Sequence, residues 1–540
     1  MKVSVNGAQM KRIDADTIER IGIPSMVLME RAALAVAGEV ERIAEDAGFS
    51  CGRTGEAGAW GGKAGSGRIA SGRPARVWIA CGTGNNGADG IAAGRILHGR
   101  GYDVTVLLAG NLDHASPEHR SQQAIAKRLG VPLTEYRDFI PGSCDIIVDA
   151  VFGIGLHRSV EGEYRELLQM LAAQKTKRVV AVDIPSGIHA DNGSVMGISL
   201  PAETTVTFGY LKTGLLLYPG KEYAGKVIVA DIGFSDISLE NAGWDAFVTE
   251  PADLGRLPVR REDSNKGTYG RLLLIAGSKG MSGAAYLGAL SAYRTGAGLV
   301  KILTVEDNRQ ILQSQLPEAI VETYLPGDVQ KEGEDFGRFI EGQCGWATAV
   351  VLGPGLSGEP YVERLVELVL AHAYVPVVLD ADALNAVARC PKLTSYYTEN
   401  IIITPHIGEM SRLTGQSVPE IKADALAAAR EYSGSYGITC VLKDAVTVIA
   451  DKDGITYLNA GGNSGLAKGG SGDVLAGVIG GLLAQGAELQ DAAVLGVCLH
   501  GMAGDAAARA LGKRSLLAHE IGDFISEALS EVQTVAKEQK

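Results

Sequence analysis

Short apolar runs alternate with helical patterns over most of the first half of the chain. The strand candidates are RVWIAC, VTVLLAG, DIIVDA, RVVAVDIP, TTVTFG and KVIVADIG. Helical stretches fit between several of them, notably over residues 89–100 and 116–129. Nearly continuous apolar strands separated by helices are typical of a buried parallel sheet with helices on both faces. This half is therefore predicted to be an α/β doubly wound sheet.

Two segments precede the first of these strands. Residues 14–45 carry apolar side chains at roughly helical spacing, with one break at Gly22-Ile23-Pro24, which predicts helices on either side of the break. Residues 51–74 are rich in glycine and serine and poor in aliphatic side chains. That composition predicts a flexible surface excursion, to which we assign no chemistry.

The alternation lapses between about residues 235 and 266, where the chain is polar and irregular. We place a domain junction there, which gives domains 1–240 and 241–540. A second α/β series follows, with strand candidates RLLLIAGS, LVKILTV, AVVLGPG, PVVLDAD, NIIITPH and ITCVLKD. VTVIAD and GITYLN then predict a hairpin around Lys452-Asp453-Gly454. Three helical stretches, starting near Gly472, Gln490 and Ala518, close the chain.

Composition narrows the class of protein. Glycine accounts for 71 of 540 residues, about 13%, which predicts many tight loops. The net charge of −13 argues against broad nucleic-acid binding. The seven cysteines are scattered and include no Cys-x-x-Cys pair, which favours reduced thiols over a disulfide framework or a zinc site. We see neither a signal peptide nor a membrane-spanning apolar run, and we expect a cytoplasmic protein.

The first glycine-rich loop with candidate chemistry is CGTGNNGADG, between a predicted strand and a predicted helix. Gly82, Gly84 and Gly87 match the spacing of the dinucleotide fingerprint, and such glycines let backbone N–H groups approach a phosphate at a helix N-terminus. The next strand lacks the acidic residue expected about 20 residues later, which argues against a dehydrogenase. A turn with Asn85 and Asn86 in the left-handed region is the open structural alternative.

Two further loops, DAVFGIGLHRS and VDIPSG, each carry an aspartate at the end of an apolar strand. Asp149, Ser186 and Asn86 together would offer hard oxygen ligands suited to a Group I or Group II cation. Asp183 could then serve in proton transfer. Because a single aspartate at a strand end can equally be a helix N-cap, that alternative stays open.

The ordered set QMKRIDADTIERIGIPSMVLMERAA, GTGNNGADG, DAVFGIGL and DIPSG resembles the NAD(P)HX epimerase family, the YjeF N-terminal domain, over about residues 1–235. The resemblance implies a Rossmann-like domain with Asp183 as its catalytic residue and potassium held by Asn86, Asp149 and Ser186. The family more often has glycine where this chain has Ala88. The implied substrate-binding residues are Asn85, Asn86, Gly87, Ala88, Asp89, Gly153, Ile154, Gly155, Leu156, His157, Arg158, Ser159 and Asp183.

In the second half, AKGGSGDVLAG opens a long apolar helix. No Gly-x-x-x-x-Gly-Lys-Ser/Thr is present, which excludes a P-loop NTPase. The glycines allow backbone amides to form an anion nest at the helix N-terminus. Asp473, in the first turn, could take a proton from a substrate hydroxyl while the amides neutralise a transferred phosphate. An N-capping role for Asp473 is the alternative.

The remaining loops carry weaker signals. Gly353, Gly355 and Gly358 formally repeat the dinucleotide spacing, but Pro354 favours a rigid, ligand-facing turn. His406 could be either structural or catalytic. Lys443 follows an apolar strand and could reach a nucleotide phosphate as a point charge, or be a solvated strand-end lysine.

NKGTYGRLLLIAGS, GPG, DADALN, TPHIGE, LKDAVTVI and AKGGSGD, in this order, resemble the ribokinase-like superfamily and, within it, the ADP-dependent NAD(P)HX dehydratases, over about residues 250–530. The resemblance implies an α/β/α sandwich with Asp473 as its catalytic residue. Ala284, Gly355, His406 and Asp473 would contact the hydrated nicotinamide nucleotide. Asp444 stands where glycine is common, and Ile407 where proline is common. The implied adenine-nucleotide residues are Lys443, Asp444, Ala445, Val446, Thr447 and Gly472.

Together the resemblances imply a bifunctional coenzyme repair enzyme. The first domain would interconvert the epimers of NADHX and NADPHX, with K⁺. The second would phosphorylate the S epimer with ADP and Mg²⁺, and loss of phosphate would restore NADH or NADPH. We expect a homo-oligomer that binds neither nucleic acid nor membrane. The alternatives are a kinase of a vitamin-type hydroxyl compound and, for the first domain, a non-catalytic binding or dimerisation module. The choice between ADP and ATP, and between NADHX and NADPHX, stays open.

Overall fold

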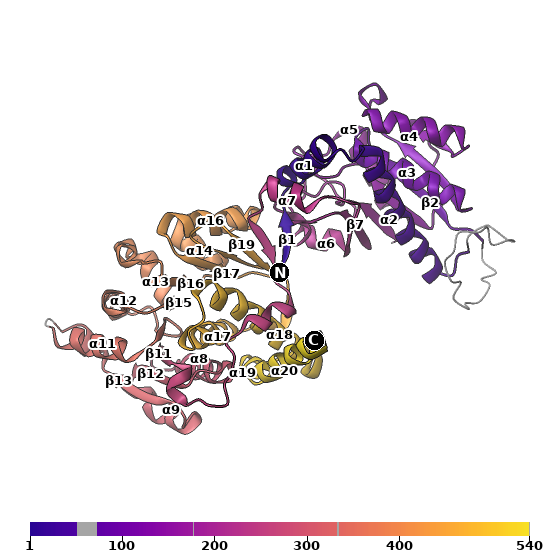
Figure 1. The fold of residues 1–540 in the computed structure, drawn as a ribbon. Coiled ribbons are helices and arrows are strands. Elements are labelled where there is room, and N and C mark those ends of the chain that lie inside the picture. The colour runs from indigo at the N-terminus through magenta and orange to yellow at the C-terminus, as the bar shows by residue number, and fades with distance from the viewer. Residues whose placement is uncertain (51–72, 177, 332–333, 539–540) are drawn as a thin grey trace. The chain divides into compact units, whose positions relative to one another are not determined.

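The computed structural model describes residues 1–50, 73–176, 178–331 and 334–538. Residues 51–72, most of the predicted surface excursion, lie outside the described residues. The chain divides into two compact units (Figure 1), Val3–Trp244 and a second one made of Met1–Lys2 with Asp245–Lys540. The change of unit thus falls a few residues after position 240, and the first two residues join the second unit. No helix in the described residues is long and apolar enough to cross a membrane.

The first unit contains a seven-stranded sheet in which every neighbouring pair is parallel. The strands run in the order β4-β3-β2-β5-β6-β7-β9. The chain passes outward in two directions from the pair β2 and β5, and such a switch point opens a crevice at the carboxyl ends of the strands. The bounds are β4 Leu133–Glu135, β3 Asp103–Leu108, β2 Arg76–Cys81, β5 Ile146–Ala150, β6 Val179–Val182, β7 Thr204–Phe208 and β9 Lys226–Ala230.

Alternating residues of the central strand β2 supply the two faces of this sheet. Val77, Ile79 and Cys81 pack into a core with α2 (Ser25–Asp46) and α3 (Asn85–Gly99). Trp78 and Ala80 pack on the other face, with α5 (Gly162–Ala172). The helices on both faces confirm the predicted doubly wound class, because a strand buried on both sides is apolar at every position. β4 was not predicted, since three residues give no periodic signal.

The N-terminal segment forms a strand and two helical stretches around the predicted break. β1 (Lys2–Val5) pairs in parallel with β8 (Leu211–Lys212) through Ser4 and Val5. α1 (Gly7–Asp16) continues into a π-helical turn (Thr17–Ile21), and Gly22 ends it with a φ of 88°. α2 then begins after Pro24. The unit's other helices are α4 Pro117–Arg128, α6 Gly220–Ala224 and α7 Asp236–Ala242.

The strands of the second unit run in the order β13-β12-β11-β14-β15-β16-β17-β18-β19-β10. All neighbouring pairs are parallel except β17 with β18 and β18 with β19. The antiparallel pair β18 and β19 confirms the predicted hairpin. The bounds are β10 Ala246–Val248, β11 Arg271–Ile275, β12 Leu299–Val305, β13 Ile320–Tyr324, β14 Ala349–Leu352, β15 Val377–Leu379, β16 Ile401–Ile403, β17 Thr439–Leu442, β18 Thr447–Ala450 and β19 Thr456–Asn459.

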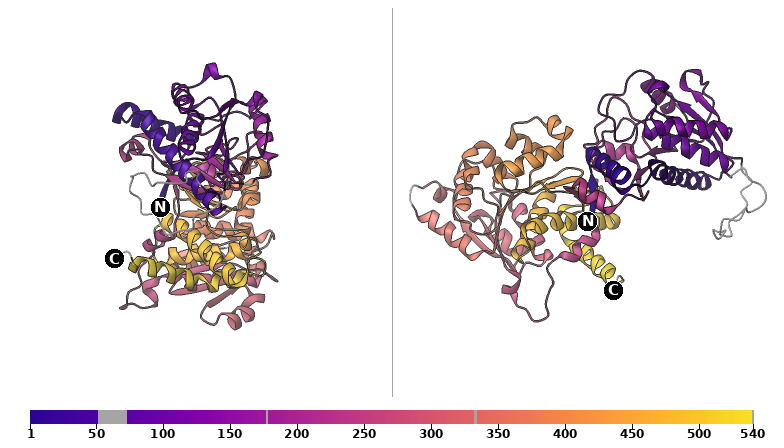
Figure 2. Two further views of the ribbon diagram at one scale, coloured as in Figure 1. Left: turned by 90° about the vertical axis from the view of Figure 1, so that its right-hand side faces the viewer. Right: turned by 45° about the horizontal axis from the view of Figure 1, so that its top comes forward.

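The last helices of the chain gather together in the second unit, yellow in Figure 2. α17 (Ser471–Ala484) lies against α8 (Ser282–Thr295) so closely that a Cβ on Gly477 would meet the Gly288 carbonyl oxygen at 2.2 Å. Glycine there allows the two backbones to touch. α18 Leu489–Leu511, α19 Ala518–Asp523 and α20 Ile525–Glu538 follow. The other helices are α9 Arg309–Gln315, α10 Pro326–Val329, α11 Asp335–Trp346, α12 Tyr361–His372, α13 Asp382–Arg389, α14 Ile407–Thr414, α15 Val418–Ala423 and α16 Ala425–Tyr436.

Candidate active sites

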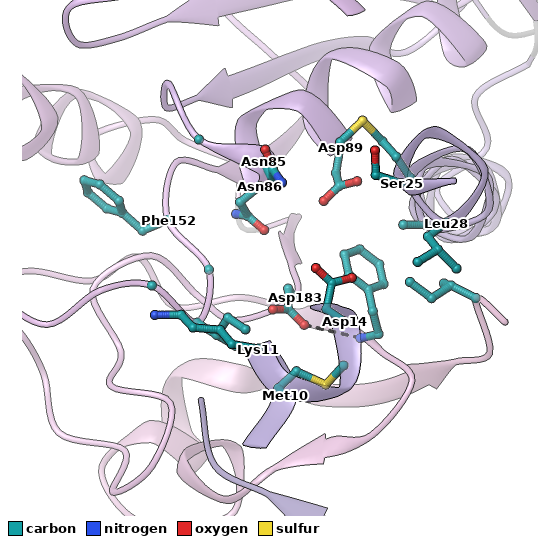
Figure 3. A pocket seen from close by; sticks show the side chains of 18 of the residues that line it. Met10, Lys11, Asp14, Ser25, Leu28, Asn85, Asn86, Asp89, Phe152 and Asp183 are labelled. Carbon is teal, nitrogen blue, oxygen red and sulfur yellow. Dashed lines mark hydrogen bonds between the residues drawn. The ribbon is translucent and has the colours of Figure 1, made fainter. Parts of the chain in front are cut away.

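A cavity of about 500 Å³ opens at the carboxyl edge of the first unit's sheet. Its walls come from α1, the start of α2, the β2–α3 loop, the loop after β5 and the end of β6 (Figure 3). Asp14, Asp89 and Asp183 extend into the same space from three different elements. This position is the switch-point crevice that the strand order predicts.

The cavity gathers part of the predicted substrate set. The predicted residues that line it are Asn85, Asn86, Asp89, Gly153, Ile154, Gly155, Leu156 and Asp183. Gly87 and Ala88 are buried behind them, and His157, Arg158 and Ser159 are exposed outside the lining. A Cβ on Gly87 would lie 1.8 Å from the Gly82 carbonyl oxygen, so that glycine is needed for close packing of the loop.

The structural alternative for the glycine-rich loop is wrong. Asn85 and Asn86 occupy the first turn of α3. The non-glycine residues with positive φ in the described chain are Asp183, Ser357 and Ala381. The loop thus feeds directly into a helix, as an anion-binding helix N-terminus requires.

Asp183 is held in an uncommon backbone conformation by several donors. Its φ is 66°, a left-handed value that costs a non-glycine residue on the order of 1–3 kcal/mol and concentrates at functional sites. Its Oδ1 accepts hydrogen bonds from Lys212 Nζ at 2.6 Å, Thr207 Oγ1 at 3.1 Å and the Phe208 N–H at 3.3 Å. Lys212 is only 1% exposed, so this ion pair is buried.

The second carboxylate oxygen of Asp183 lies beside Gly153. A Cβ on Gly153 would be 3.4 Å from Asp183 Oδ2 and 3.0 Å from Asn86 Oδ1. The absence of a side chain therefore leaves room next to both oxygens. Asn86 Nδ2 is buried and has no hydrogen-bond partner in the described structure, which leaves its amide available to a bound group.

Two further carboxyl groups share the cavity. Burial, followed by the charges of Asp183 and Asp14, raises the pKa of Asp89 well above its usual range. Burial and the charges of Asp183 and Glu118 also raise the pKa of Asp14. Both carboxyl groups therefore hold a proton more strongly than an ordinary aspartate does, beside Asp183 and its lysine. The sequence analysis missed Asp14 and Lys212. A lone lysine in the apolar segment GYLKTGLLL was the available signal, because unpaired lysine is rarely buried.

The predicted cation ligands Asp149 and Ser186 lie together beneath the cavity. Asp149 is fully buried, and it accepts hydrogen bonds from Ser186 Oγ at 2.5 Å, the Ser186 N–H at 2.8 Å and the Val151 N–H at 3.4 Å. Burial raises the pKa of Asp149, while these donors oppose the rise. Asp149 lies within β5, so the N-cap alternative is wrong for it.

The donor set around Asp149 distinguishes between kinds of cation. Among the described residues, no basic side chain pairs with Asp149, and no group of three histidine, cysteine or acidic side chains could hold a metal. One carboxylate with neutral oxygens compensates one positive charge better than two. The residues present therefore offer oxygen ligands to a hard cation, as predicted.

In the second unit, the loops after β11, β14, β15, β16 and β17 lie along one edge of the sheet with the start of α17. Gly470, with a φ of 96°, is the N-cap of α17, and Asp473 occupies the first turn. The N-cap alternative for Asp473 is therefore wrong. Burial, followed by the charge of Asp380, raises the pKa of Asp473 to about 7, with Lys443 opposing the rise and Asp382 adding to it.

Lys443 is not a solvated strand-end lysine. Its Nζ donates a hydrogen bond to Asp380 Oδ1 at 2.7 Å, and that same oxygen accepts one from Thr404 Oγ1 at 2.7 Å. Asp380 is 1% exposed. A Cβ on Gly472 would be 3.3 Å from Lys443 Nζ, so the ammonium group lies over the first turn of α17. Asp380, the first residue of DADALN, was not among the predicted site residues.

The other predicted residues of this unit differ in their surroundings. Gly355, with a φ of 63°, lies so close to Ala284 that a Cβ on it would meet the Ala284 Cβ at 2.8 Å. His406 caps α14, because its Nδ1 accepts from the Gly408 N–H at 2.9 Å, while its ring is 54% exposed. Asp444 and Ala445 are exposed, Val446 is buried, and Thr447 begins β18.

Comparison with known families covers both units. The family described as YjeF-related protein N-terminus matches residues 25–214. The family described as NAD(P)H-hydrate dehydratase matches residues 272–527. A solved ADP/ATP-dependent NAD(P)H-hydrate dehydratase from Bacillus subtilis is 36% identical, covers 53% of this chain and 97% of its own, and superposes with a TM-score of 0.46.

Curated relatives span nearly the whole chain. The bifunctional NAD(P)H-hydrate repair enzyme of Moorella thermoacetica is 35% identical over 98% of this chain and 98% of its own length. The enzyme of the same description from Thermofilum pendens is 34% identical over 97% of this chain and 95% of its own. The one from Escherichia coli is 36% identical over 83% and 84%. This chain therefore belongs to the family of bifunctional NAD(P)H-hydrate repair enzymes.

Proposed function

We propose that this protein repairs hydrated nicotinamide nucleotides with one active site in each unit. The first, at 1–240, epimerises R- and S-NAD(P)HX, and the second, at 241–540, dehydrates S-NAD(P)HX to NAD(P)H with ADP, which becomes AMP and phosphate. The observation that carries this proposal is that each unit of a bifunctional family member places aspartates at the carboxyl edge of its own sheet, and a lysine bonds to one of them. Lys212 bonds to Asp183 in the first unit, and Lys443 bonds to Asp380 in the second.

In the first unit, Asp183 acts as the catalytic residue. Epimerisation breaks the bond between C6 and its hydroxyl oxygen on one face of the ring, and water forms a new C6–O bond on the other face. The leaving oxygen must gain a proton, and the incoming water must lose one. Asp183, paired with Lys212, offers the carboxylate, while burial and neighbouring charges raise the pKa of Asp89 and of Asp14, which makes both better proton donors than an ordinary aspartate. Acid and base thus face one cavity. The loops 85–89 and 153–159 would hold the nucleotide.

A potassium ion in this unit would be held by Asn86, Asp149 and Ser186. When bound, the ion would supply one positive charge at the carboxyl edge of the sheet. Asp149 is buried without a basic partner, and the Asn86 amide lacks one hydrogen-bond partner. Both features support a monovalent cation at this position.

In the second unit, the C6 hydroxyl oxygen of the substrate attacks the terminal phosphorus of ADP, and Asp473 takes the proton of that hydroxyl. The bond from that phosphorus to AMP breaks, and the phosphorylated hydrate then loses phosphate from C6 and a proton from the neighbouring carbon. Phosphorylation helps because hydroxide is a poor leaving group. The pKa near 7 makes Asp473 an effective base at neutral pH. Mg²⁺, bound with the nucleotide, would neutralise negative charge on the phosphates during the transfer.

Substrate contacts at this site are assigned to Ala284, Gly355, His406 and Asp473, and nucleotide contacts to residues 443–447 and Gly472. The exposure of Asp444 supports its place in a nucleotide site, since it is not forced into the interior beside phosphates. His406 also has a structural role as the cap of α14.

The kinase of a vitamin-type hydroxyl compound remains the rival for the second unit, and it predicts a stable phosphorylated product. A mixture of NADPHX epimers with ADP or ATP separates the two. We expect complete recovery of reduced-nicotinamide absorbance; a persistent phosphorylated product would favour the kinase. Recovery that stops near half would support the reading of the first unit as a non-catalytic module.

Cellular location and assembly extend this proposal. A cytoplasmic homo-oligomer fits the small-molecule substrates. The six cysteines in the described residues are free, in keeping with a reducing compartment. Size-exclusion chromatography with light scattering tests the oligomeric state.

A further inference from the structure

Lys443, a partly buried lysine of the second unit, lies among several carboxyl groups but bonds to only one of them. Lys443 Nζ donates to Asp380 Oδ1 at 2.7 Å. Glu409 and Asp473 also act on Lys443 and raise its pKa, although burial alone would lower it. Asp473 itself makes no side-chain hydrogen bond to any of the described residues. Lys443 therefore bonds to Asp380, and the carboxylate oxygens of Asp473 stay available to a substrate.

Asp380 is held rigidly in this arrangement. Its backbone N–H, directly after β15, donates to the Leu352 carbonyl oxygen of β14 at 3.0 Å. Thr404, after β16, donates its hydroxyl to Asp380 Oδ1 at 2.7 Å. The carboxylate is thus fixed by neighbouring strands, and at 1% exposure it does not face solvent. A carboxylate is rarely buried in this way unless it is paired with a charge.

The geometry around Gly472 shows where Asp380 directs the lysine. A Cβ on Gly472 would be 3.3 Å from Lys443 Nζ and 3.8 Å from Asp380 Oδ2. Gly472 lies in the first turn of α17, directly before Asp473. The ammonium group therefore lies beside the helix N-terminus, where backbone N–H groups point outward to an anion.

We propose that Asp380 is the positioning residue for phosphoryl transfer in the second unit. It holds Lys443 Nζ over Gly472, toward the phosphate, and prevents Lys443 from forming an ion pair with Asp473. The carboxylate of Asp473 then stays available to the substrate hydroxyl. This inference rests on the proposed dehydratase function.

The proposal predicts a particular pH dependence. The charged groups that act on Asp473 are Asp380, Lys443 and Asp382. Glu409 and the buried His500, whose pKa burial lowers to about 4, lie next to Lys443 and complete the set. Removal of the Asp380 charge takes away repulsion and releases Lys443 toward Asp473. Both effects lower the pKa of Asp473 and move the acid limb of the rate profile to lower pH.

The test compares two neutralised aspartates in the full-length protein, with S-NADPHX and ADP as substrates from pH 5.5 to 9. Asp380→Asn should move the midpoint of the acid limb of kcat down by about one pH unit. It should lower the plateau of kcat about 10–100-fold, because Lys443 would no longer lie where the phosphoryl group is transferred. The change in KM for ADP should be smaller. Asp380→Glu should recover part of kcat.

Asp382→Asn is the matched control, because it removes the same charge two residues away. The Asp382 carboxylate accepts hydrogen bonds from the Ser357 N–H and Asn385 Nδ2. Its neutralisation should move the acid limb by a clearly smaller amount. Equal shifts in the two variants, or an unchanged profile in Asp380→Asn, would overturn the proposal.

A second variant tests the proposal even if Asp380→Asn does not fold. Asp380→Asn/Lys443→Gln removes both buried charges at once, and such a neutral replacement is far less damaging than a broken pair. We expect it to melt close to the native protein and still to lose kcat about 100-fold or more. A double variant with nearly native kcat would overturn the proposal. Absence of ADP-dependent recovery by the unmodified protein would instead refute the dehydratase function.

Discussion

The two units use a lysine and an aspartate in opposite ways. In the first unit, Lys212 bonds directly to Asp183 at 2.6 Å. In the second, Lys443 bonds to Asp380 at 2.7 Å, and Asp473 is left with a pKa raised to about 7. The same pair of residue types thus forms an ion pair with the proposed catalytic aspartate in one site and with a neighbouring aspartate in the other. The difference teaches that a lysine near a catalytic aspartate is informative only once its bonding partner is known.

The largest expected effect comes from removing each of the two proposed catalytic carboxylates. Asp473→Asn should lower ADP-dependent dehydration of S-NADPHX by about 10²–10⁴-fold, because the hydroxyl loses its proton acceptor. Epimer exchange should continue. Chromatographic separation of the R and S forms, alongside absorbance at the reduced-nicotinamide band, measures both reactions. If both activities fell together, the two sites would not be independent.

Asp183→Asn is the converse experiment. Epimer exchange should slow by about 10²–10⁴-fold while dehydration of pure S-NADPHX persists. Recovery from a mixture of epimers should then stop near the fraction that was initially S. Exchange at the native rate would show that Asp183 is structural and would favour a non-catalytic first unit.

Lys212→Met tests how much the Lys212–Asp183 ion pair contributes to the stability of the first unit. It leaves Asp183 buried without its cation, which typically costs about 3–5 kcal/mol of unfolding free energy. Denaturant unfolding of the first unit measures the loss. Lys212→Met/Asp183→Asn removes both charges and should recover much of it. If the single variant were as stable as the native protein, the ion pair would not be part of the structure in solution.

The dehydratase reaction should depend on pH near neutrality. The dehydratase base must be ionised, so kcat should rise with pH through about 7, the raised pKa of Asp473. Because the folded protein retains that proton above the usual range of an aspartate, ionisation of Asp473 lowers stability as the pH rises from about 4 to 7. A dehydratase rate independent of pH over this interval would contradict the role of Asp473.

The smallest expected effect is at Gly153. Gly153→Ala would place a methyl group 3.0 Å from Asn86 Oδ1 and 3.4 Å from Asp183 Oδ2. We expect a rise of about two- to tenfold in the epimerase KM, because such a contact requires a shift of a few tenths of an ångström. Gly155→Ala is the control, since a Cβ there has no neighbour within 4 Å. An equal rise in KM for the two variants would show that the close contacts at residue 153 are unimportant for substrate binding.

The sequence by itself determined the class of fold and the edge of each sheet where chemistry lies. Apolar strands such as those around Val77 and Leu272 encode their structure locally, and glycine-rich turns mark the carboxyl ends of parallel strands. Short strands such as β4 escaped prediction, because three residues carry no periodicity. Asp183 and Asp473 could be chosen because each lies in a motif at such a turn.

Only the tertiary structure decided which charges meet. Lys212 is 29 residues from Asp183, and Lys443 is 63 from Asp380. These pairs form because parallel strands bring distant loops to one edge, and burial then magnifies each charge. A sequence motif fixes what a side chain can do, whereas its protonation depends on neighbours that folding alone supplies.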